Sequence, residues 1–221
     1  MAERWATFDC YGTLIDWNGG IARELERLFG VERVARLLTC YHAIEPEVQR
    51  EHPTSSYRDV LAMSLARLAE RESLELAPAE HGALGQSLPS WPPFPEASAA
   101  LEEARTRGWR LAILSNTDRD FLEASMDKLH VPFDMSIVAS EIGSYKPAPG
   151  HWDTFERETG ATRDCWVHVA ASLFHDVVPA TERGLRTVWI NRLGEDAEPE
   201  PEIELHSLTG LGESLDSLVP A

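Results

Sequence analysis

The stretch Phe8-Asp9-Cys10-Tyr11-Gly12-Thr13-Leu14 decides how the rest of the sequence is interpreted. It follows residues 5–8, a short and mostly apolar run of strand-forming residues, so Asp9 stands where a buried strand ends. A carboxylate in that position is costly unless another group pairs with it. Gly12 permits a tight turn whose backbone N–H groups can face an anion, and Thr13 adds a hydroxyl. The stretch therefore fits either a carboxylate nucleophile surrounded by donors or an ordinary strand followed by a turn.

The bulk composition predicts a globular protein with one sizeable core and a smaller module. The chain has 221 residues, and its 43% hydrophobic and 26% charged residues are ordinary values for such a protein. A net charge of −17 argues against nucleic acid and against an anionic membrane surface as partners. A small anionic substrate would have to enter against this field, which predicts a local cationic site.

Two features indicate a cytoplasmic location. No apolar run approaches the roughly 20 residues that span a bilayer, and residues 3–8 predict a strand instead of a signal peptide. Cys10, Cys40 and Cys165 have neither metal-like spacing nor a disulfide framework, as expected in a reducing compartment.

Residues 17–92 are predicted to form a helical cap domain. Residues 16–20 break the strand pattern and predict a hinge. Apolar residues then recur at helical spacing up to Pro46, which we expect to kink or end its helix near Glu45. A further helix begins after Thr54 or Ser55, and a short one covers residues 78–88. The proline-rich stretch 88–95 is the expected return linker.

From Glu96 onward, strands and helices are predicted to alternate. The strands are expected at 109–114, 135–139, 165–170 and 187–190, and several of them are wholly apolar. This pattern is typical of an α/β fold with a doubly wound parallel sheet, a Rossmann-like core built from residues 1–16 and 93–221. Ligands of such sheets bind beyond the carboxyl ends of the strands, so polar residues at those ends are the candidates for a site.

Three further polar stretches follow predicted strands. Ser115 and Asn116 could donate to an anion or cap the next helix. Lys146, in Gly143-Ser144-Tyr145-Lys146-Pro147, could be a compact cation for a carboxylate or an ordinary surface turn residue. Asp176, at the start of a helix, could be a site residue or an N-cap.

Taken in order, these four stretches resemble the motifs of the haloacid dehalogenase superfamily. The form Asp-x-Tyr-Gly-Thr-Leu is similar to its type II 2-haloacid dehalogenase branch. The resemblance implies that Asp9 is the nucleophile, Lys146 pairs with it, Asp176 is the general base, and Thr13 orients Asp9. It also implies that Ser115 binds the substrate carboxylate or phosphate and that Asn116 lines the leaving-group side.

The sequence departs from this branch at several positions. Members of the branch carry an Arg on the second cap helix for the leaving halide, and the matching stretch, residues 39–42, has none. Tyr41 or His42 could donate instead, and both are predicted to face the cleft between cap and core. Trp152 stands where a Tyr is usual. The predicted substrate-binding residues are Cys10, Tyr11, Ser115, Asn116, Tyr41, His42, Trp152, Ser172 and His175.

The predicted function is hydrolytic dehalogenation of a small 2-haloacid through an aspartyl ester, without metal or other cofactor. The prediction extends to fluoroacetate-type substrates. A small, hard halide such as fluoride requires strong hydrogen-bond donors, which Tyr41 or His42 could provide in place of the arginine. One alternative is a Mg²⁺-dependent phosphatase, although Tyr11 and Ala171 stand where such enzymes carry two further acids. The other is a non-hydrolytic binding member of the superfamily. The expected assembly is a monomer or a homodimer.

Overall fold

A six-stranded sheet lies at the centre of the protein, with all strands parallel, in the order β3-β2-β1-β4-β5-β6. The computed structural model describes residues 3–197 and 201–220. The strands are β1 (Arg4–Phe8), β2 (Trp109–Ser115), β3 (Met135–Val138), β4 (Trp166–Ala170), β5 (Arg186–Ile190) and β6 (Ile203–Leu205). The predicted doubly wound parallel core is confirmed.

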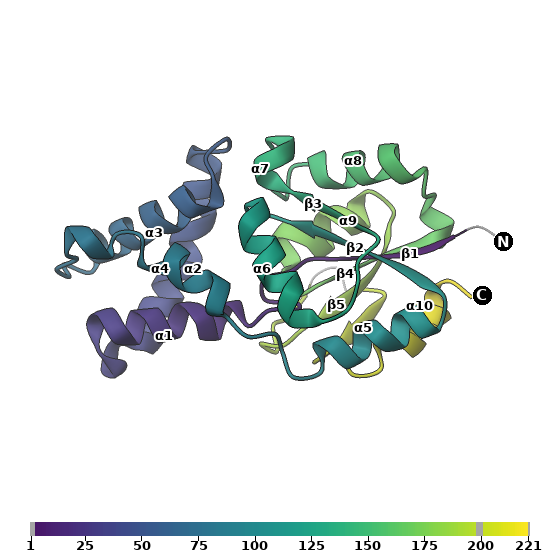
Figure 1. Cartoon of the computed structure of the whole chain (residues 1–221), viewed down its shortest axis with the longest axis horizontal. Helices are drawn as coiled ribbons and strands as arrows, with labels where there is room; N and C mark the ends of the chain where they lie inside the picture. The colour runs from purple at the N-terminus through teal and green to yellow at the C-terminus, as the bar shows by residue number, and fades with distance from the viewer. Residues whose placement is uncertain (1–2, 198–200, 221) are drawn as a thin grey trace.

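Helices cover both faces of this sheet (Figure 1). On one face, α5 (Ala97–Thr106) and α10 (Leu211–Leu218) pack with Phe8 of β1 in one apolar cluster. On the other face, α8 (Gly150–Thr159) and α9 (Val178–Glu182) pack with Trp5 in a second cluster. Because successive strand residues point to opposite faces, the even- and odd-numbered residues of β1 supply the two clusters.

The position of β1 in the middle of the sheet brings Asp9 to the carboxyl edge. β1 pairs with β2 on one side and with β4 on the other. Asp9 directly follows the strand, and its backbone N–H still donates to the carbonyl of Val169 at 3.0 Å. Its carboxylate therefore leaves the sheet at the edge where ligands of parallel sheets bind.

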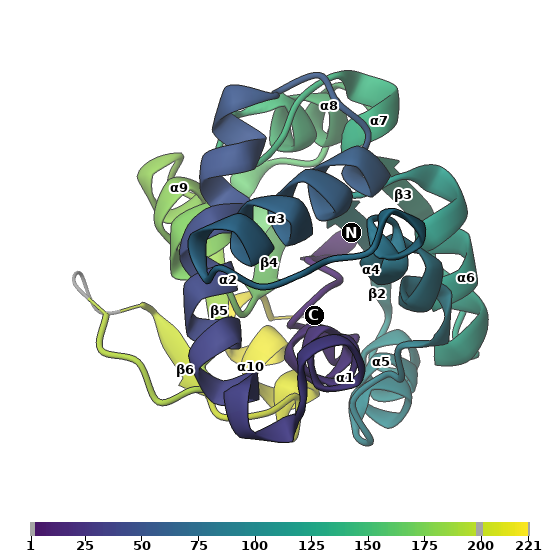
Figure 2. The ribbon, with the colours of Figure 1, turned by 90° about the vertical axis from the view of Figure 1, so that its left-hand side faces the viewer.

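The cap consists of helices that lie beyond this edge. They are α1 (Trp17–Phe29), α2 (Val34–Glu51), α3 (Tyr57–Arg71) and α4 (Ala83–Ser87). Figure 1 shows them at one end of the molecule, opposite both termini, and Figure 2 shows them from the cap side. An inserted helical cap is thus confirmed, while the residue boundaries 16/17 and 92/93 stay a prediction. None of the helices in the described ranges combines the length and apolar character that a membrane span requires.

Of the two expected effects of Pro46, ending its helix near Glu45 is wrong, because α2 continues from Val34 through Pro46 to Glu51, while a kink at this position stays a prediction. Proline removes one backbone hydrogen bond, but tertiary packing supplies most of the stability of a helix in a protein. Here Tyr41, Ile44 and Val48, on both sides of the proline, are fully buried in the cap. Their shared buried face packs both halves of α2 against the rest of the cap.

Other differences lie at short elements. The helix expected at 78–88 is a five-residue α4 between two 3₁₀ turns. β6 and α10 were not predicted, because three strand residues and eight helical residues give weak periodic signals. The acidic stretch 194–201, predicted to be a solvated loop, lies partly outside the described residues.

The core holds the cap through Asp118. This residue precedes α6 (Arg119–Leu129), but its side chain does not cap that helix. Its two carboxylate oxygens instead accept hydrogen bonds from the backbone N–H groups of Tyr57 and Arg58, both at 2.9 Å. Free N–H groups at a helix start favour a carboxylate, so Asp118 fixes the first turn of α3 against the core.

Asp118→Ala should therefore lower the free energy of unfolding by about 1–3 kcal/mol, since two N–H groups at the start of α3 lose a charged acceptor. Urea denaturation, compared at constant slope, measures this change. The matched control is Asp120→Ala, because Asp120 makes an exposed ion pair with Arg58. Such pairs contribute about 0–1 kcal/mol. Equal effects of the two substitutions would contradict the role of Asp118.

Candidate active site

A cleft of about 770 Å³ lies between the cap and the carboxyl edge of the sheet. Polar side chains line it from the ends of four strands. Asp9 follows β1, Ser115 ends β2, Asp176 lies in the segment after β4, and Arg192 follows β5. Lys146 completes the floor of the cleft.

Lys146 joins the two acids of the cleft. Its ammonium donates to Asp9 Oδ1 at 2.9 Å, to Asp176 Oδ1 at 2.6 Å and to the carbonyl of Leu114 at 2.7 Å. These three acceptors satisfy all three N–H donors of a side chain that is only 1% exposed. Lys146 is therefore a fixed internal cation between two carboxylates, and the surface-turn alternative is wrong.

Thr13 fixes the second oxygen of the Asp9 carboxylate. Its hydroxyl donates to Asp9 Oδ2 at 2.9 Å and accepts from the backbone N–H of Ala171 at 2.9 Å. The hydroxyl thus links the turn after β1 to the turn after β4. With Lys146 on one oxygen and Thr13 on the other, the orientation of Asp9 is determined.

Asp176 is held by a second donor that the sequence analysis did not identify. His168 Nε2 lies 2.9 Å from Asp176 Oδ1, and His168 Nδ1 lies 2.9 Å from the Thr7 hydroxyl. Thr7 also accepts from Trp166 Nε1 at 2.8 Å. Because an ionised carboxylate only accepts hydrogen bonds, this buried chain places a proton on Nε2 of His168.

The charges of these groups depend on one another. Burial alone raises the pKa of Asp176, but Lys146 and His168 outweigh it and hold that pKa below its usual range. Burial likewise opposes the charge of Lys146, yet the two carboxylates keep its pKa above the ordinary value. Burial raises the pKa of Asp9, against the effect of Lys146. Asp176 is therefore the acid of this pair that stays ionised more readily.

Ser115 and Asn116 lie in the cleft but differ in their contacts. Ser115 is buried, and among the described residues its hydroxyl has no hydrogen-bond partner. The Asn116 amide instead donates to the carbonyl of Lys146 at 2.9 Å and accepts from its N–H at 2.7 Å. Ser115 is thus free to bind a ligand, whereas Asn116 fixes the loop that carries Lys146.

His175 and Ser172 also reach the cleft. The Ser172 hydroxyl accepts from the backbone N–H of His175 and lies 3.1 Å from its Nδ1. Nε2 of His175 is buried without a partner in the part of the chain that the structure describes. Burial lowers the pKa of His175 to about 4, so its imidazole is neutral at neutral pH. The substrate-binding role of both residues stays a prediction.

Three predicted substrate-binding side chains lie away from the cleft. Cys10 is fully buried among the apolar side chains of one face of the sheet, because it follows Asp9 and points to the opposite side. Tyr41 is fully buried inside the cap, so the prediction that it faces the cleft is wrong. Trp152 packs in the cluster on the other face of the sheet, with its ring 5.8 Å from that of His168.

Two predicted residues line the cleft in a different way from that expected. His42 is exposed at the cleft, where its ring stacks on Trp17 and its Nε2 lies 2.8 Å from Asn18 Oδ1. The hydroxyl of Tyr11 donates to the carbonyl of Phe121 at 3.1 Å. Tyr11 therefore contributes its ring to the cleft.

His168 was not predicted, and neither were several residues that line the cleft. Arg192 follows β5, so the rule of polar residues at strand ends would have found it. Its guanidinium donates to Glu96 at 2.7 Å and to the carbonyl of Thr13 at 2.9 Å. Glu45 and Gln49 on α2 are both buried and face the cleft from the cap. No signal distinguished them in the sequence, since polar residues on a helix are usually solvated.

The arrangement of the acids decides whether the cleft can hold a metal ion. Within residues 3–197 and 201–220, no group of three or more His, Cys, Asp or Glu side chains is arranged to hold a metal ion. Asp9 and Asp176 are the two acids at the floor of the cleft, and Lys146 bonds to both. These residues do not fit the oxygen cage of carboxylates that Mg²⁺ prefers.

The fold and the cleft define a capped α/β enzyme whose site holds two carboxylates joined by a lysine. Residues 4–173 match the haloacid dehalogenase-like hydrolases, and the chain belongs to this family. The predicted resemblance is thereby confirmed.

Individual relatives agree with this assignment. The (S)-2-haloacid dehalogenase 4A of Burkholderia cepacia is 25% identical over 214 residues, which cover 95% of this chain and 92% of that protein. The crystal structure of an L-2-haloacid dehalogenase superposes with a TM-score of 0.87 at 25% identity, covering 98% of this chain and 100% of that chain. The phosphoserine phosphatase of Thermus thermophilus is 31% identical, but over 122 residues that cover 53% of this chain and 49% of that protein.

Lys146→Met should lower the free energy of unfolding by about 3–5 kcal/mol at pH 7, because it leaves two buried carboxylates without their cation. Without Lys146 the pKa values of both acids in the folded state rise above those in the unfolded state. The penalty is then present at high pH and is relieved as the pH falls through the raised pKa values. Chemical denaturation at a series of pH values measures this deficit.

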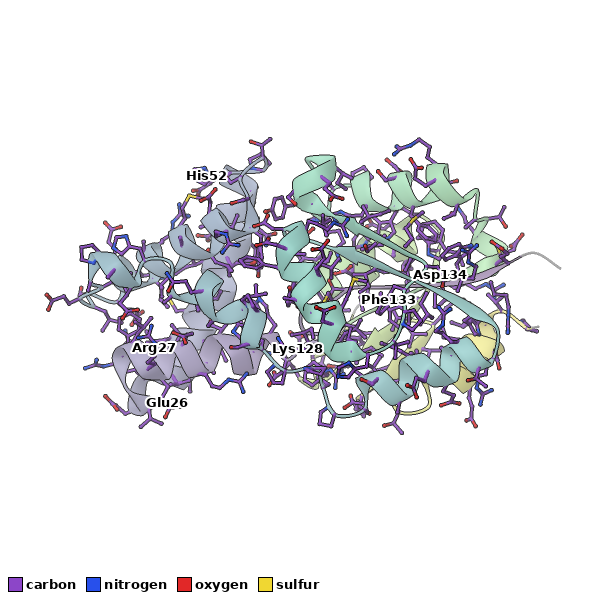
Figure 3. All side chains as sticks on the ribbon, viewed as in Figure 1. Glu26, Arg27, His52, Lys128, Phe133 and Asp134 are labelled. Atoms are coloured by element: carbon purple, nitrogen blue, oxygen red, sulfur yellow. The ribbon has the colours of Figure 1, made fainter. Side chains whose placement is uncertain are left out.

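The chain's other lysine provides the control. Lys128, labelled in Figure 3, extends from α6 and donates to the carbonyl of Pro89. Lys128→Met should change stability by about 0.5 kcal/mol and should not depend on pH in this range. A deficit in Lys146→Met that stays constant from neutral to acidic pH would contradict the charge arrangement proposed for the site.

Proposed function

We propose that the protein hydrolyses the carbon–halogen bond of a small 2-haloacid through an ester formed on Asp9. The observation that carries this proposal is the Lys146 ammonium, which bonds to Asp9 at 2.9 Å and to Asp176 at 2.6 Å. This contact orients the Asp9 carboxylate as the nucleophile. It also keeps Asp176, the more readily ionised carboxylate, available as the base. Relatives named as 2-haloacid dehalogenases match nearly the whole chain, which supports this choice.

In the first step the Asp9 carboxylate attacks the substrate carbon that bears the halogen. The new C–O bond forms as the carbon–halogen bond breaks, and the electron pair leaves with the halide. Lys146 and Thr13 hold the attacking carboxylate in one orientation. In intramolecular reactions such orientation lowers the activation free energy by a large part. The free hydroxyl of Ser115 and the guanidinium of Arg192 are the candidate ligands for the substrate carboxylate.

In the second step water attacks the carbonyl carbon of the Asp9 ester. Asp176 takes the proton of this water through its Oδ2, because Lys146 and His168 already bond to its Oδ1. No group among the described residues donates to Asp176 Oδ2, and this oxygen is therefore available to water. His168 positions Asp176 for this step. The bond between the Asp9 carbonyl carbon and the substrate oxygen then breaks, and the departing alkoxide takes the proton from Asp176. The products are the 2-hydroxyacid and the Asp9 carboxylate, whose remaining proton passes to solvent.

A Mg²⁺-dependent phosphatase is the second candidate, supported by the partial match to a phosphoserine phosphatase. Tyr11 and Ala171 contribute no oxygen anion to the cleft, which favours the dehalogenase.

We therefore expect halide release from chloroacetate, 2-chloropropionate or fluoroacetate to survive EDTA. Parallel assays of halide and phosphate release, each with EDTA and with added Mg²⁺, test this expectation. Phosphate release that requires Mg²⁺, together with no halide release, would establish the phosphatase instead.

The ester on Asp9 predicts where solvent oxygen goes. In a single turnover in heavy-oxygen water with enzyme in excess, the first product should carry an unlabelled hydroxyl oxygen, and the peptide that contains Asp9 should gain the label. The physical reason is that the product's oxygen comes from the Asp9 carboxylate, which solvent then replenishes. Mass spectrometry of the product and of the peptide measures both.

If Asp9 were a general base, water would attack the substrate directly. Label in the product with none in the peptide is the outcome that contradicts the ester. Asp9→Asn serves as the control for background exchange of the peptide, because its amide cannot form the ester.

A further inference from the structure

Glu45 is a buried carboxyl group on the cap side of the cleft. It lies on α2, is 6% exposed, and lines the same cavity as Asp9. Nothing in the first or second step described above uses it. A carboxyl group removed from water next to a second acid is costly unless it is neutral or paired with a cation.

The contacts of Glu45 are polar and uncharged. Gln49 Nε2 donates to Glu45 Oε1 at 2.6 Å, and Gln49 Oε1 accepts from Asn116 across the domain boundary at 3.5 Å. Within the described parts of the chain, no Lys, Arg or His lies within salt-bridge distance of Glu45. Glu45 is therefore a buried carboxyl group held by one amide, with no cation beside it to stabilise a charge.

Burial and the charge of Asp9 both favour the neutral, protonated state of Glu45. Burial raises the pKa of Glu45 to about 7, and the charge of Asp9 adds to the increase, against hydrogen bonds from Gln49 and Tyr57. Titratable and charged groups face Glu45 or line the cleft with it from both domains. From the cap and the segment before it they are Asp16, Tyr41, His42, Arg50 and Tyr57, and from the core they are Asp9, Tyr11, Tyr145, Lys146, His175, Asp176, Arg192 and Glu195.

The direction of the reaction gives this acid a role. In an in-line displacement the leaving group departs on the side opposite the nucleophile. Asp9 attacks from the floor of the cleft, at the edge of the sheet, so the leaving halide points toward the cap. The buried polar residues that α2 presents there are Glu45 and Gln49.

We propose that Glu45 is the leaving-group donor of this enzyme: a neutral carboxylic acid of the cap that hydrogen-bonds the departing halide. This inference rests on the proposed function. As the bond from Asp9 to carbon forms and the carbon–halogen bond breaks, the electron pair leaves with the halide. The proton stays on Glu45 and is shared in the new hydrogen bond, so charge and atoms balance. An ionised Glu45 repels the same halide.

The rate of halide release as a function of pH tests the proposal in three variants. Wild-type kcat/KM should fall up to tenfold per pH unit as the pH rises above about 7, where Glu45 loses its proton. Glu45→Gln keeps an N–H donor without a titrating group, so it should stay active and lose this alkaline decrease. Glu45→Ala removes the donor and should lower kcat by about 100-fold or more.

The control is Glu47→Gln, two residues along α2 and outside the cleft, which should reproduce the wild-type profile. Two results would overturn the proposal. One is a Glu45→Gln enzyme as inactive as Glu45→Ala, which would indicate that an ionised carboxylate is needed. The other is a Glu45→Gln enzyme with the full alkaline decrease of the wild type.

A binding measurement separates this inference from the proposed function. Chloride alone, without substrate, is followed by the line width of its NMR signal in the presence of each protein. Protein-dependent broadening should decrease as the pH rises through about 7 in the wild type and be absent in Glu45→Ala. Equal broadening in both proteins, or none in either, overturns the role of Glu45. Broadening that depends on Glu45, with no halide release from any haloacid, overturns the proposed function alone.

Discussion

The ion pairs of Lys146 with Asp9 and Asp176 are the interaction on which the rest of the structure depends. Two carboxylates can be buried at the edge of a sheet only if a cation lies between them, and Lys146 is 1% exposed. This requirement explains the surrounding contacts. Asn116 hydrogen-bonds the backbone of Lys146, and Thr13 donates to the second oxygen of Asp9. His168 donates to the same oxygen of Asp176 that Lys146 binds.

The cap completes the site from the other side. Asp118 of the core receives the first N–H groups of α3, and Gln49 of α2 reaches Asn116 of the core. These contacts set the wall that faces Asp9, and that wall carries a carboxyl group on α2, the cap helix on which the resembled branch carries an arginine. A halide that leaves toward such a wall requires a neutral donor, since a carboxylate would repel it. In the function proposed above, the core supplies the nucleophile and the cap supplies the donor for the leaving halide.

Much of the fold and of the floor of the cleft was predictable from short-range signals. Apolar runs bounded by turns marked β1, β2, β4 and β5, and the rule that ligands bind at carboxyl ends selected Asp9, Ser115, Lys146 and Asp176. The same rule applied to the second residue after β5 would have added Arg192. The continuation of α2 past Pro46 was not predicted, because the burial of its apolar face depends on the other cap helices.

The sequence by itself determined the parallel sheet, the helical insertion and the order of the acids and the lysine, because periodicity and strand ends are local properties of the chain. Only the tertiary structure decided which side chains turn toward the cleft. Tyr41 and Glu45 lie on the same helix one turn apart, yet the tyrosine is buried inside the cap and the acid faces Asp9. His168 sits in an apolar strand, and its contact with Asp176 forms only when the turn after β4 folds back over the strand. Such contacts depend on how whole elements pack, and no local pattern contains that information.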